Sequence, residues 1–170
     1  QEGDATSIEN MKAVIPWLKK TNDLRAKHNL NALNVSLWEM ALAQANSDWA
    51  QENIEHSGIY DHGENLSWGY QDPFDGWYDE EKAIYDTFDD SLKQLSANDL
   101  SKKYPDKYNQ VGHYLNIVHP NFTSFGMGHS SIGDYGRNDS QDFLFRKKHS
   151  SDVIMTVDDF EKKLTEYENK

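Results

Sequence analysis

The chain has 170 residues, which suits one domain with a sizeable core. Its formal net charge of −12 disfavours nucleic acid and anionic membranes as partners, because an acidic surface repels phosphate groups. The absence of cysteine excludes disulfides, thiolate metal sites and a cysteine nucleophile. Since no apolar run approaches the roughly 18 residues that a membrane-spanning helix needs, the sequence predicts no transmembrane segment.

Two helical segments begin the chain. Apolar residues recur at helical spacing from Ile8, and Pro16 predicts a kink or a new helix start before the segment ends near His28. Ser36 and Glu39 then have the spacing of a capping box, which predicts a second helix as far as about residue 53. The face that we expect this helix to bury carries Trp38, Leu42, Ala45 and Trp49.

A third helix is predicted to begin at Asp72-Pro73, because proline is tolerated in the first turn of a helix. The face that we expect it to bury carries Trp77, Ile84 and Phe88. Glu80 and Glu81 lie three and four residues after Trp77, so both flank this face. Periodicity alone does not choose between these two carboxylates.

The second half of the chain has the pattern of strands. Three stretches are rich in β-branched and aromatic residues, namely 111–119, 122–130 and 142–147, with a turn region at 133–140 before the last. The polar stretch 91–109 predicts one short helix and a loop. Strands that follow a group of helices predict an α+β domain with an antiparallel sheet.

The C-terminal residues predict one further helix. Thr156 has the position of an N-cap, and Asp158 and Asp159 suit the positive end of the helix dipole. We therefore divide the chain into a domain at 1–150 and a C-terminal helical extension at 151–170.

Histidine and glutamate are the residue types that could carry chemistry. Two imidazoles with two carboxylates can bind a metal such as zinc, act as an acid–base pair, or form a solvated polar cleft. The residues alone leave these alternatives open, and the solvated cleft is the simplest. Motifs of other enzyme classes are absent, including His-Glu-x-x-His, Gly-x-Ser-x-Gly, the Walker loop and the dinucleotide fingerprint.

Five motifs, in this order, resemble the CAP (SCP-like) superfamily of cysteine-rich secretory proteins, antigen-five venom allergens and plant pathogenesis-related proteins. The motifs are Leu24-Arg25-Ala26-Lys27-His28-Asn29, His56-Ser57, Gly63-Glu64-Asn65-Leu66-Ser67-Trp68-Gly69, Trp77-Tyr78-Asp79-Glu80 and Gly112-His113-Tyr114-Leu115-Asn116-Ile117-Val118. The likeness covers about residues 8–148. The absence of cysteine, and His119-Pro120-Asn121 where the signature usually runs into tryptophan, resemble the cysteine-free bacterial branch.

The resemblance implies a three-layer α-β-α sandwich with a central antiparallel sheet. It also implies a bacterial protein that is exported and is extracellular or associated with the cell wall.

The family cleft holds two histidines and two glutamates, and the resemblance places them at His56, Glu64, Glu80 and His113. Metal-bearing members imply His56 and His113 as ligands of Zn²⁺ or another divalent cation. The two glutamates would then bind water or orient the rings. The alternatives are His62 in place of His56 and Glu81 in place of Glu80.

Three functions follow from these observations. The first is an exported binding module for a peptide, glycan, lipid or host surface, with a divalent-cation cleft and no turnover. The second is a metal-dependent, peptidase-like hydrolase in which Glu64 or Glu80 is the base. The third is lipid or sterol carriage, for which the aromatic loop 68–74 is the local signal. We favour the binding module, because the tetrad is not accompanied by a strong nucleophile.

Overall fold

A computed structural model describes residues 2–58 and 63–170. The helices are α1 (Ile8–Ala13), α2 (Ile15–Lys27), α3 (Leu37–Trp49), the π-helical turn η1 (Asp75–Glu80), α4 (Glu81–Asp86), α5 (Asp90–Lys93), α6 (Ala97–Lys103), α7 (Pro105–Tyr108), α8 (Gly112–Ile117) and α9 (Val157–Glu168). The strands are β1 (Asn34–Ser36), β2 (Gly63–Trp68), β3 (Ser124–Ser130), β4 (Asn138–Leu144) and β5 (Ile154–Met155).

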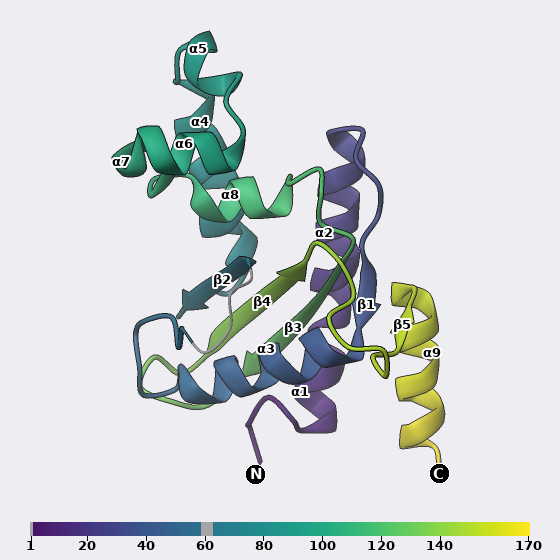
Figure 1. Cartoon of the computed structure of the whole chain (residues 1–170). Helices are drawn as coiled ribbons and strands as arrows, with labels where there is room; N and C mark the ends of the chain where they lie inside the picture. Colours follow the sequence, from purple (N-terminus) through teal and green to yellow (C-terminus); the bar gives the residue numbers. More distant parts are fainter. Residues whose placement is uncertain (1, 59–62) are drawn as a thin grey trace.

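One sheet of five strands, in the order β2-β4-β3-β1-β5, forms the middle layer (Figure 1). The β2–β4, β4–β3 and β1–β5 pairs are antiparallel, and β1 runs parallel to β3. The three-layer sandwich is therefore confirmed, but its sheet is mixed. The parallel pair is possible because most of the chain, with several helices, lies between β1 and β3 and returns the chain in the same direction.

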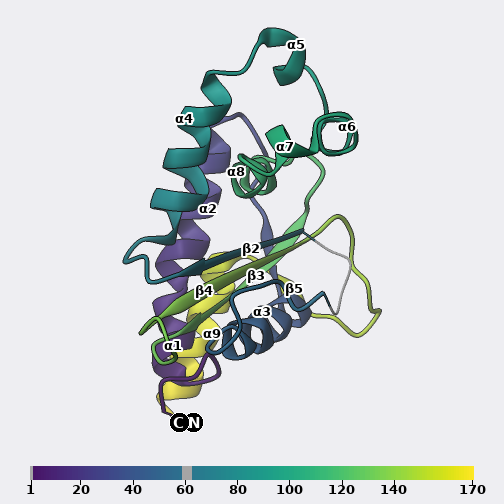
Figure 2. The same ribbon diagram turned by 90° about the vertical axis from the view of Figure 1, so that its left-hand side faces the viewer.

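Neighbouring residues of β4 identify the two outer layers. The Gln141 amide donates to Thr21 Oγ1 of α2 at 2.8 Å, whereas Asp142 accepts from Asn46 of α3 at 3.2 Å. Because successive strand residues point to opposite faces, α2 and α3 cover opposite sides of the sheet. Figure 2 shows α3 on one side of the strands and α4 and α8 on the other.

Helix α3 lies directly on the backbone of β3. A Cβ at Gly126 would overlap the backbone of Glu39 and Met40, and one at Gly128 would overlap that of Ala43. Only glycine lets the helix approach a strand this closely. The two glycines therefore set the spacing between these layers.

The buried face of α3 differs from the expected one. Leu42 is buried as expected, but Ala45 is exposed. The other buried residues of α3 include Glu39, Met40, Ala43, Asn46 and Ser47. The buried face of α3 is partly polar because strand β4, which it faces, also carries polar side chains. For example, Ser47 Oγ donates to Asn138 Oδ1 at 2.7 Å. A search for apolar periodicity does not detect such a face.

Two of the predicted strands change. Stretch 111–119 was expected to be a strand but contains α8, and the last three residues of the expected turn at 133–140 belong to β4. Asn, Asp and Ser favour turns in isolation, yet all seven residues of β4 are buried here. Tertiary hydrogen bonds satisfy their polar groups, so local propensity is overridden.

The main core lies between the sheet and the layer of α2, η1 and α8. Its largest fully buried side chains include Trp77, Phe74, Phe125 and Phe143. Phe88, Leu100 and Val111 form a second, smaller core beneath α4 to α7. Figures 1 and 2 both show these short helices rising away from the sheet. Stretch 91–109 thus holds more than the one expected helix.

The C-terminal helix packs on the domain. Phe160 and Leu164 of α9 belong to the main core, and β5 just before it pairs with β1. The side chain of Thr156 caps α9 by accepting from Asp159 N–H at 3.1 Å, as its position predicted.

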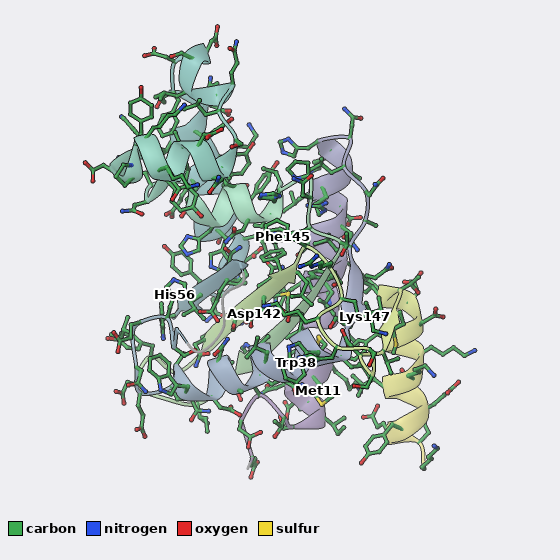
Figure 3. All side chains as sticks on the ribbon, viewed as in Figure 1. Met11, Trp38, His56, Asp142, Phe145 and Lys147 are labelled. Carbon is green, nitrogen blue, oxygen red and sulfur yellow. The ribbon has the colours of Figure 1, made fainter. Side chains whose placement is uncertain are left out.

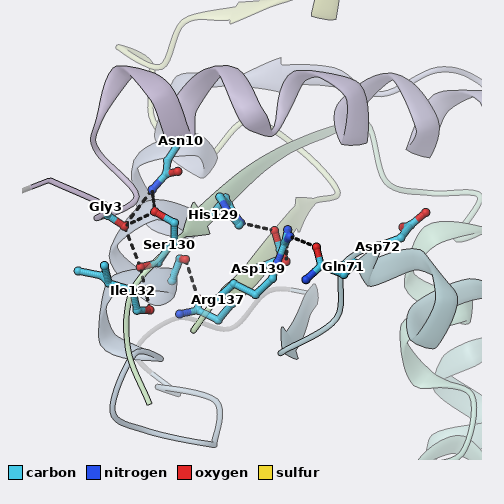
Figure 4. Close-up of polar contacts among 12 residues, drawn as sticks. Gly3, Asn10, Gln71, Asp72, His129, Ser130, Ile132, Arg137 and Asp139 are labelled. Atoms are coloured by element: carbon cyan, nitrogen blue, oxygen red, sulfur yellow. Dashed lines mark hydrogen bonds and ion pairs between the residues drawn. The ribbon is translucent and has the colours of Figure 1, made fainter. Parts of the chain in front are cut away.

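A separate polar network closes the other end of the sheet (Figure 4). His129 Nδ1 donates to Asp139 Oδ1 at 2.8 Å, and both side chains are buried. Arg137 lies 3.6 Å from the second oxygen of Asp139 and also donates to Gln71 Oε1 at 3.3 Å. His129 therefore has a structural position. Among the described helices, none is long and apolar enough to cross a lipid bilayer.

Candidate functional site

The first histidine–carboxylate pair lies at the start of edge strand β2. His56 Nδ1 donates to Glu64 Oε1 at 2.6 Å. This hydrogen bond raises the pKa of His56 above its ordinary value. Since Nδ1 is engaged, only Nε2 of this ring is left for a ligand. His56 is more than half exposed, while the Glu64 side chain is 9% exposed.

A buried network holds this pair in place. The Asn46 amide of α3 donates to Glu64 Oε2 and to Asp142 Oδ2. Its carbonyl oxygen accepts from Ser57 Oγ at 2.9 Å, so Asn46 joins the loop that carries His56 to both carboxylates. Figure 3 shows His56 at the edge of the molecule and Asp142 inside it.

Asp142 lies opposite Glu64 in the β2–β4 register and is fully buried. Burial raises the pKa of Asp142 well above its ordinary value, and the charge of Glu64 and a hydrogen bond to it act in the same direction. A neutral Asp142 can donate a hydrogen bond to Glu64. The two carboxyl groups then carry one negative charge between them, on Glu64 beside His56.

The second pair comes from the opposite layer. His113 Nδ1 in α8 donates to Glu81 Oε1 at 2.5 Å, and the other oxygen of Glu81 accepts from Tyr114 N–H at 2.9 Å. Glu81 thus orients the imidazole and also caps the start of α8. As with His56, Nε2 is the ring nitrogen left for a ligand.

Glu80, which the resemblance places in the tetrad, is exposed, and Glu81 contacts His113 instead. The physical reason is the π-helical turn η1, which ends at Glu80. Its wider turn shifts the helical phase, so counting at 3.6 residues per turn from Trp77 does not locate the inward carboxylate. The same shift leaves Ile84 exposed, although it was expected to be buried.

Asparagines connect the two pairs. Asn116 of α8 donates to Asn65 Oδ1 at 2.9 Å, and Asn65 donates to the His113 carbonyl at 3.3 Å. Glu64 and Asn65 are consecutive in β2, so their side chains face opposite layers. Strand β2 therefore carries one histidine pair on each side of its first residues.

The two histidines line one cleft. Cavities of about 240 and 170 Å³ lie side by side, and His56, Glu64, Tyr108 and Asn116 line both. His113 lines the second. The structure thus brings together three of the four expected residues, His56, Glu64 and His113. The alternative His62 lies outside the described residues.

Metal ligation can be judged from the donor set. Within residues 2–58 and 63–170, no group of three or more His, Cys, Asp or Glu side chains is placed to hold a metal ion. The available donors are two imidazole nitrogens, each on a ring oriented by a carboxylate, which is the usual support for a metal-bound histidine. Two imidazoles are fewer protein ligands than the three of a catalytic zinc site or the four of a structural one.

Sequence reasoning missed Asn46, Asp142 and Tyr108. The signal for Asp142 is the run Asn138 to Asp142, five polar residues leading directly into the apolar pair Phe143-Leu144. A polar strand of this kind is stable only if its side chains have buried partners. Asn46 and Tyr108 stand in no comparable pattern.

A comparison with known families shows which family the chain belongs to. The family model described as the cysteine-rich secretory protein family, CAP, matches residues 18–145. The chain belongs to the CAP family. A search of the curated proteins gives no match. All cleft residues of this CAP domain lie within the matched range, whereas β5 and α9 follow it.

Proposed function

We propose that this CAP domain is an exported binding module whose ligand occupies the cleft between the His56–Glu64 and His113–Glu81 pairs. The observation that carries the proposal is that two carboxylate-oriented imidazoles line one polar cleft from opposite layers. Family membership and the complete absence of cysteine support a bacterial protein that acts outside the cell or at the cell wall.

The contacts of the cleft favour binding over turnover. Glu64 is engaged at both oxygens, by His56 and by Asn46, which suits a residue that orients the ring better than one that activates water. Glu80 is exposed and does not contact His113. Ser57 donates to Asn46 rather than to a histidine, which is not the arrangement of an activated nucleophile. A peptidase-like hydrolase therefore has less support.

A divalent cation such as Zn²⁺ is the ligand that the donor set fits best. His56 and His113 would hold it, with Glu64 and Glu81 orienting the rings. A bound cation would supply positive charge that attracts a carboxylate, phosphate or carbonyl oxygen of a further ligand.

Isothermal titration with Zn²⁺ tests this proposal. We expect a saturable heat from the wild type that is lost in the double variant His56→Ala/His113→Ala. His149→Ala removes an exposed histidine outside the cleft and should bind like the wild type. Equal heats from the wild type and the double variant would contradict the metal site. Thermal unfolding of each variant shows whether the fold is intact.

Lipid carriage is a second candidate, and its support lies away from the aromatic loop. Phe74 of that loop is fully buried against Trp77 and Trp17, so core packing explains it. A mainly apolar groove of about 360 Å³ instead lies between α1 and α9, with Met11 and Leu164 in its lining. Mass spectrometry of lipids extracted from the purified protein tests this candidate, and an extract without lipid would reject it.

A further inference from the structure

The connection between β4 and β5 carries the densest positive charge of the chain. Residues 145–149 read Phe-Arg-Lys-Lys-His, in a protein whose formal net charge is −12. All five side chains are exposed. Figure 3 shows Phe145 and Lys147 on this connection. We call residues 145–149 the basic segment.

A cavity lies against the basic segment. A cavity of about 760 Å³ is lined by residues 143–149, which makes it larger than either cavity of the His/Glu cleft. Its volume lies in the range of sites that accept a small molecule or a few units of a polymer.

Both ends of the basic segment are anchored. Thr123 Oγ1 donates to the Phe145 carbonyl at 3.2 Å, and Asp152 N–H donates to the His149 carbonyl at 3.1 Å. The carboxylate of Asp152 accepts from Ser36 Oγ and from Trp38 N–H. This nearby acid is therefore buried and engaged by other groups.

Positive charge at the segment is available for a ligand. Among the described residues, neither Arg146 nor Lys147 forms an ion pair. At physiological salt the field of the more distant acidic surface is screened within about 8 Å.

Aromatic rings flank these cations. Phe145 is 54% exposed and stacks on Phe122, with ring centroids 4.4 Å apart, and its edge meets His119. At the other end, the rings of His149 and Trp38 lie 4.3 Å apart. Ring faces beside cationic groups match a ligand that alternates apolar ring faces with anionic substituents.

We infer that the basic segment is a second binding surface, which takes a short stretch of an anionic polysaccharide. Arg146 and Lys147 pair with its carboxylate, sulfate or phosphate groups, and Phe145 packs on a sugar ring. Clusters of Lys and Arg on a surface are the common basis for recognising such polymers. This surface is separate from the His/Glu cleft, so it stands independently of the function proposed for that cleft.

Two other classes of partner fit less well. A peptide that adds a strand needs a regular, open strand edge, whereas the basic segment is bent and follows the end of β4. A membrane surface needs several inserted apolar side chains, and Phe145 is the only large apolar residue within the segment.

Binding of a heparin-derived hexasaccharide, measured by titration calorimetry at 50 and 150 mM NaCl, tests the inference. We expect binding that weakens as salt increases. Arg146→Glu/Lys147→Glu should weaken it by about ten-fold or more, and Phe145→Ala by a smaller factor. The matched control is Lys102→Glu/Lys103→Glu, which makes the same charge change at two exposed lysines of α6 and should have less than about a two-fold effect.

Several results would overturn the inference. They are the absence of hexasaccharide binding by the wild type, equal losses in both charge-reversed variants, and equally tight binding of neutral dextran. Vesicles containing phosphatidylserine that bind through Arg146 and Lys147 while the hexasaccharide does not would show a membrane surface instead. The milder change Lys147→Gln provides the same comparison if the double variant is unstable. His56→Ala/His113→Ala should bind the hexasaccharide normally, which separates this surface from the cleft.

Discussion

At the scale of single residues, the carboxyl group of Asp142 is the most unusual feature of the site. It is fully buried beside Glu64, and burial raises its pKa well above the ordinary value. The folded state therefore binds a proton that the unfolded state releases. Stability attributable to this group is present below the ordinary pKa and is lost as the pH rises toward the raised pKa.

Asp142→Asn should consequently stabilise the protein near pH 7.5 and have little effect near pH 4. Asparagine resembles the protonated acid, because it can accept from Asn46 and donate to Glu64 without a charge. A gain of about 1 kcal/mol corresponds to about 2–4 °C in Tm, measurable by calorimetry at both pH values.

Asp152→Asn is the matched control at a second buried aspartate. Asp152 accepts from Ser36 Oγ and Trp38 N–H, so replacing one oxygen with an amide group removes an acceptor. This variant should be less stable than the wild type at pH 7.5. A loss of the same size in Asp142→Asn would show that Asp142 is ionised in the fold.

At the scale of elements, the π-helical turn η1 determines which carboxylate reaches His113. It directs Glu81 to His113 and to the first turn of α8, and it leaves Glu80 in solvent. One local change in helical pitch thereby selects between two adjacent, chemically identical side chains.

Glu81→Gln should lower the free energy of unfolding by about 1–2 kcal/mol, because it removes a charge-assisted hydrogen bond to His113 and the charge at the start of α8. Glu80→Gln should change it by less than about 0.5 kcal/mol, as expected for an exposed position. Urea denaturation of both variants checks this. A larger effect at Glu80 would mean that the phase of η1 is different.

The contact between α3 and β3 gives a second prediction at this scale. Gly126→Ala should lower the free energy of unfolding by about 1–3 kcal/mol or more, because its Cβ would overlap the α3 backbone. That backbone cannot shift at one residue without moving the rest of the helix. At Gly112 the added Cβ would lie 3.6 Å from the Tyr108 ring, an ordinary contact. Gly112→Ala should therefore be close to neutral, and equal losses in a thermal unfolding comparison would contradict this packing.

At the scale of the whole molecule, the cleft lies where separate parts of the fold meet. Strand β2 and the loop before it supply His56 and Glu64, while the short helices above the sheet supply Tyr108 and His113. Those helices have a small core of their own. The far side of the molecule is closed by α9, which completes the main core.

Leu164→Ala tests the contribution of α9 to that core. Leu164 is 6% exposed, so the change should lower the free energy of unfolding by about 2–5 kcal/mol. Tyr167 on the same helix is 65% exposed, and Tyr167→Ala should cost much less. Chemical denaturation of the two variants measures the difference. Similar small effects would show that α9 is not part of the core.

The sequence by itself indicated the family and predicted most of the candidate site. Five ordered motifs indicated the CAP fold, and the resemblance predicted His56, Glu64 and His113, which the structure places around one cleft. The helix caps Ser36 and Thr156 could also be predicted from the sequence, because capping depends on residues three apart in the chain. Both side chains accept from the expected backbone N–H groups.

Only the tertiary structure decided between Glu80 and Glu81 and revealed the polar face shared by α3 and β4. Both depend on partners distant in sequence, such as His113 for Glu81 and Asn46 for Asp142. Local propensity reads Asn, Asp and Ser as turn residues, whereas here buried hydrogen bonds make them a strand. A pattern along the chain reports periodicity, but the partner that satisfies a buried polar group is known only once the layers are in contact.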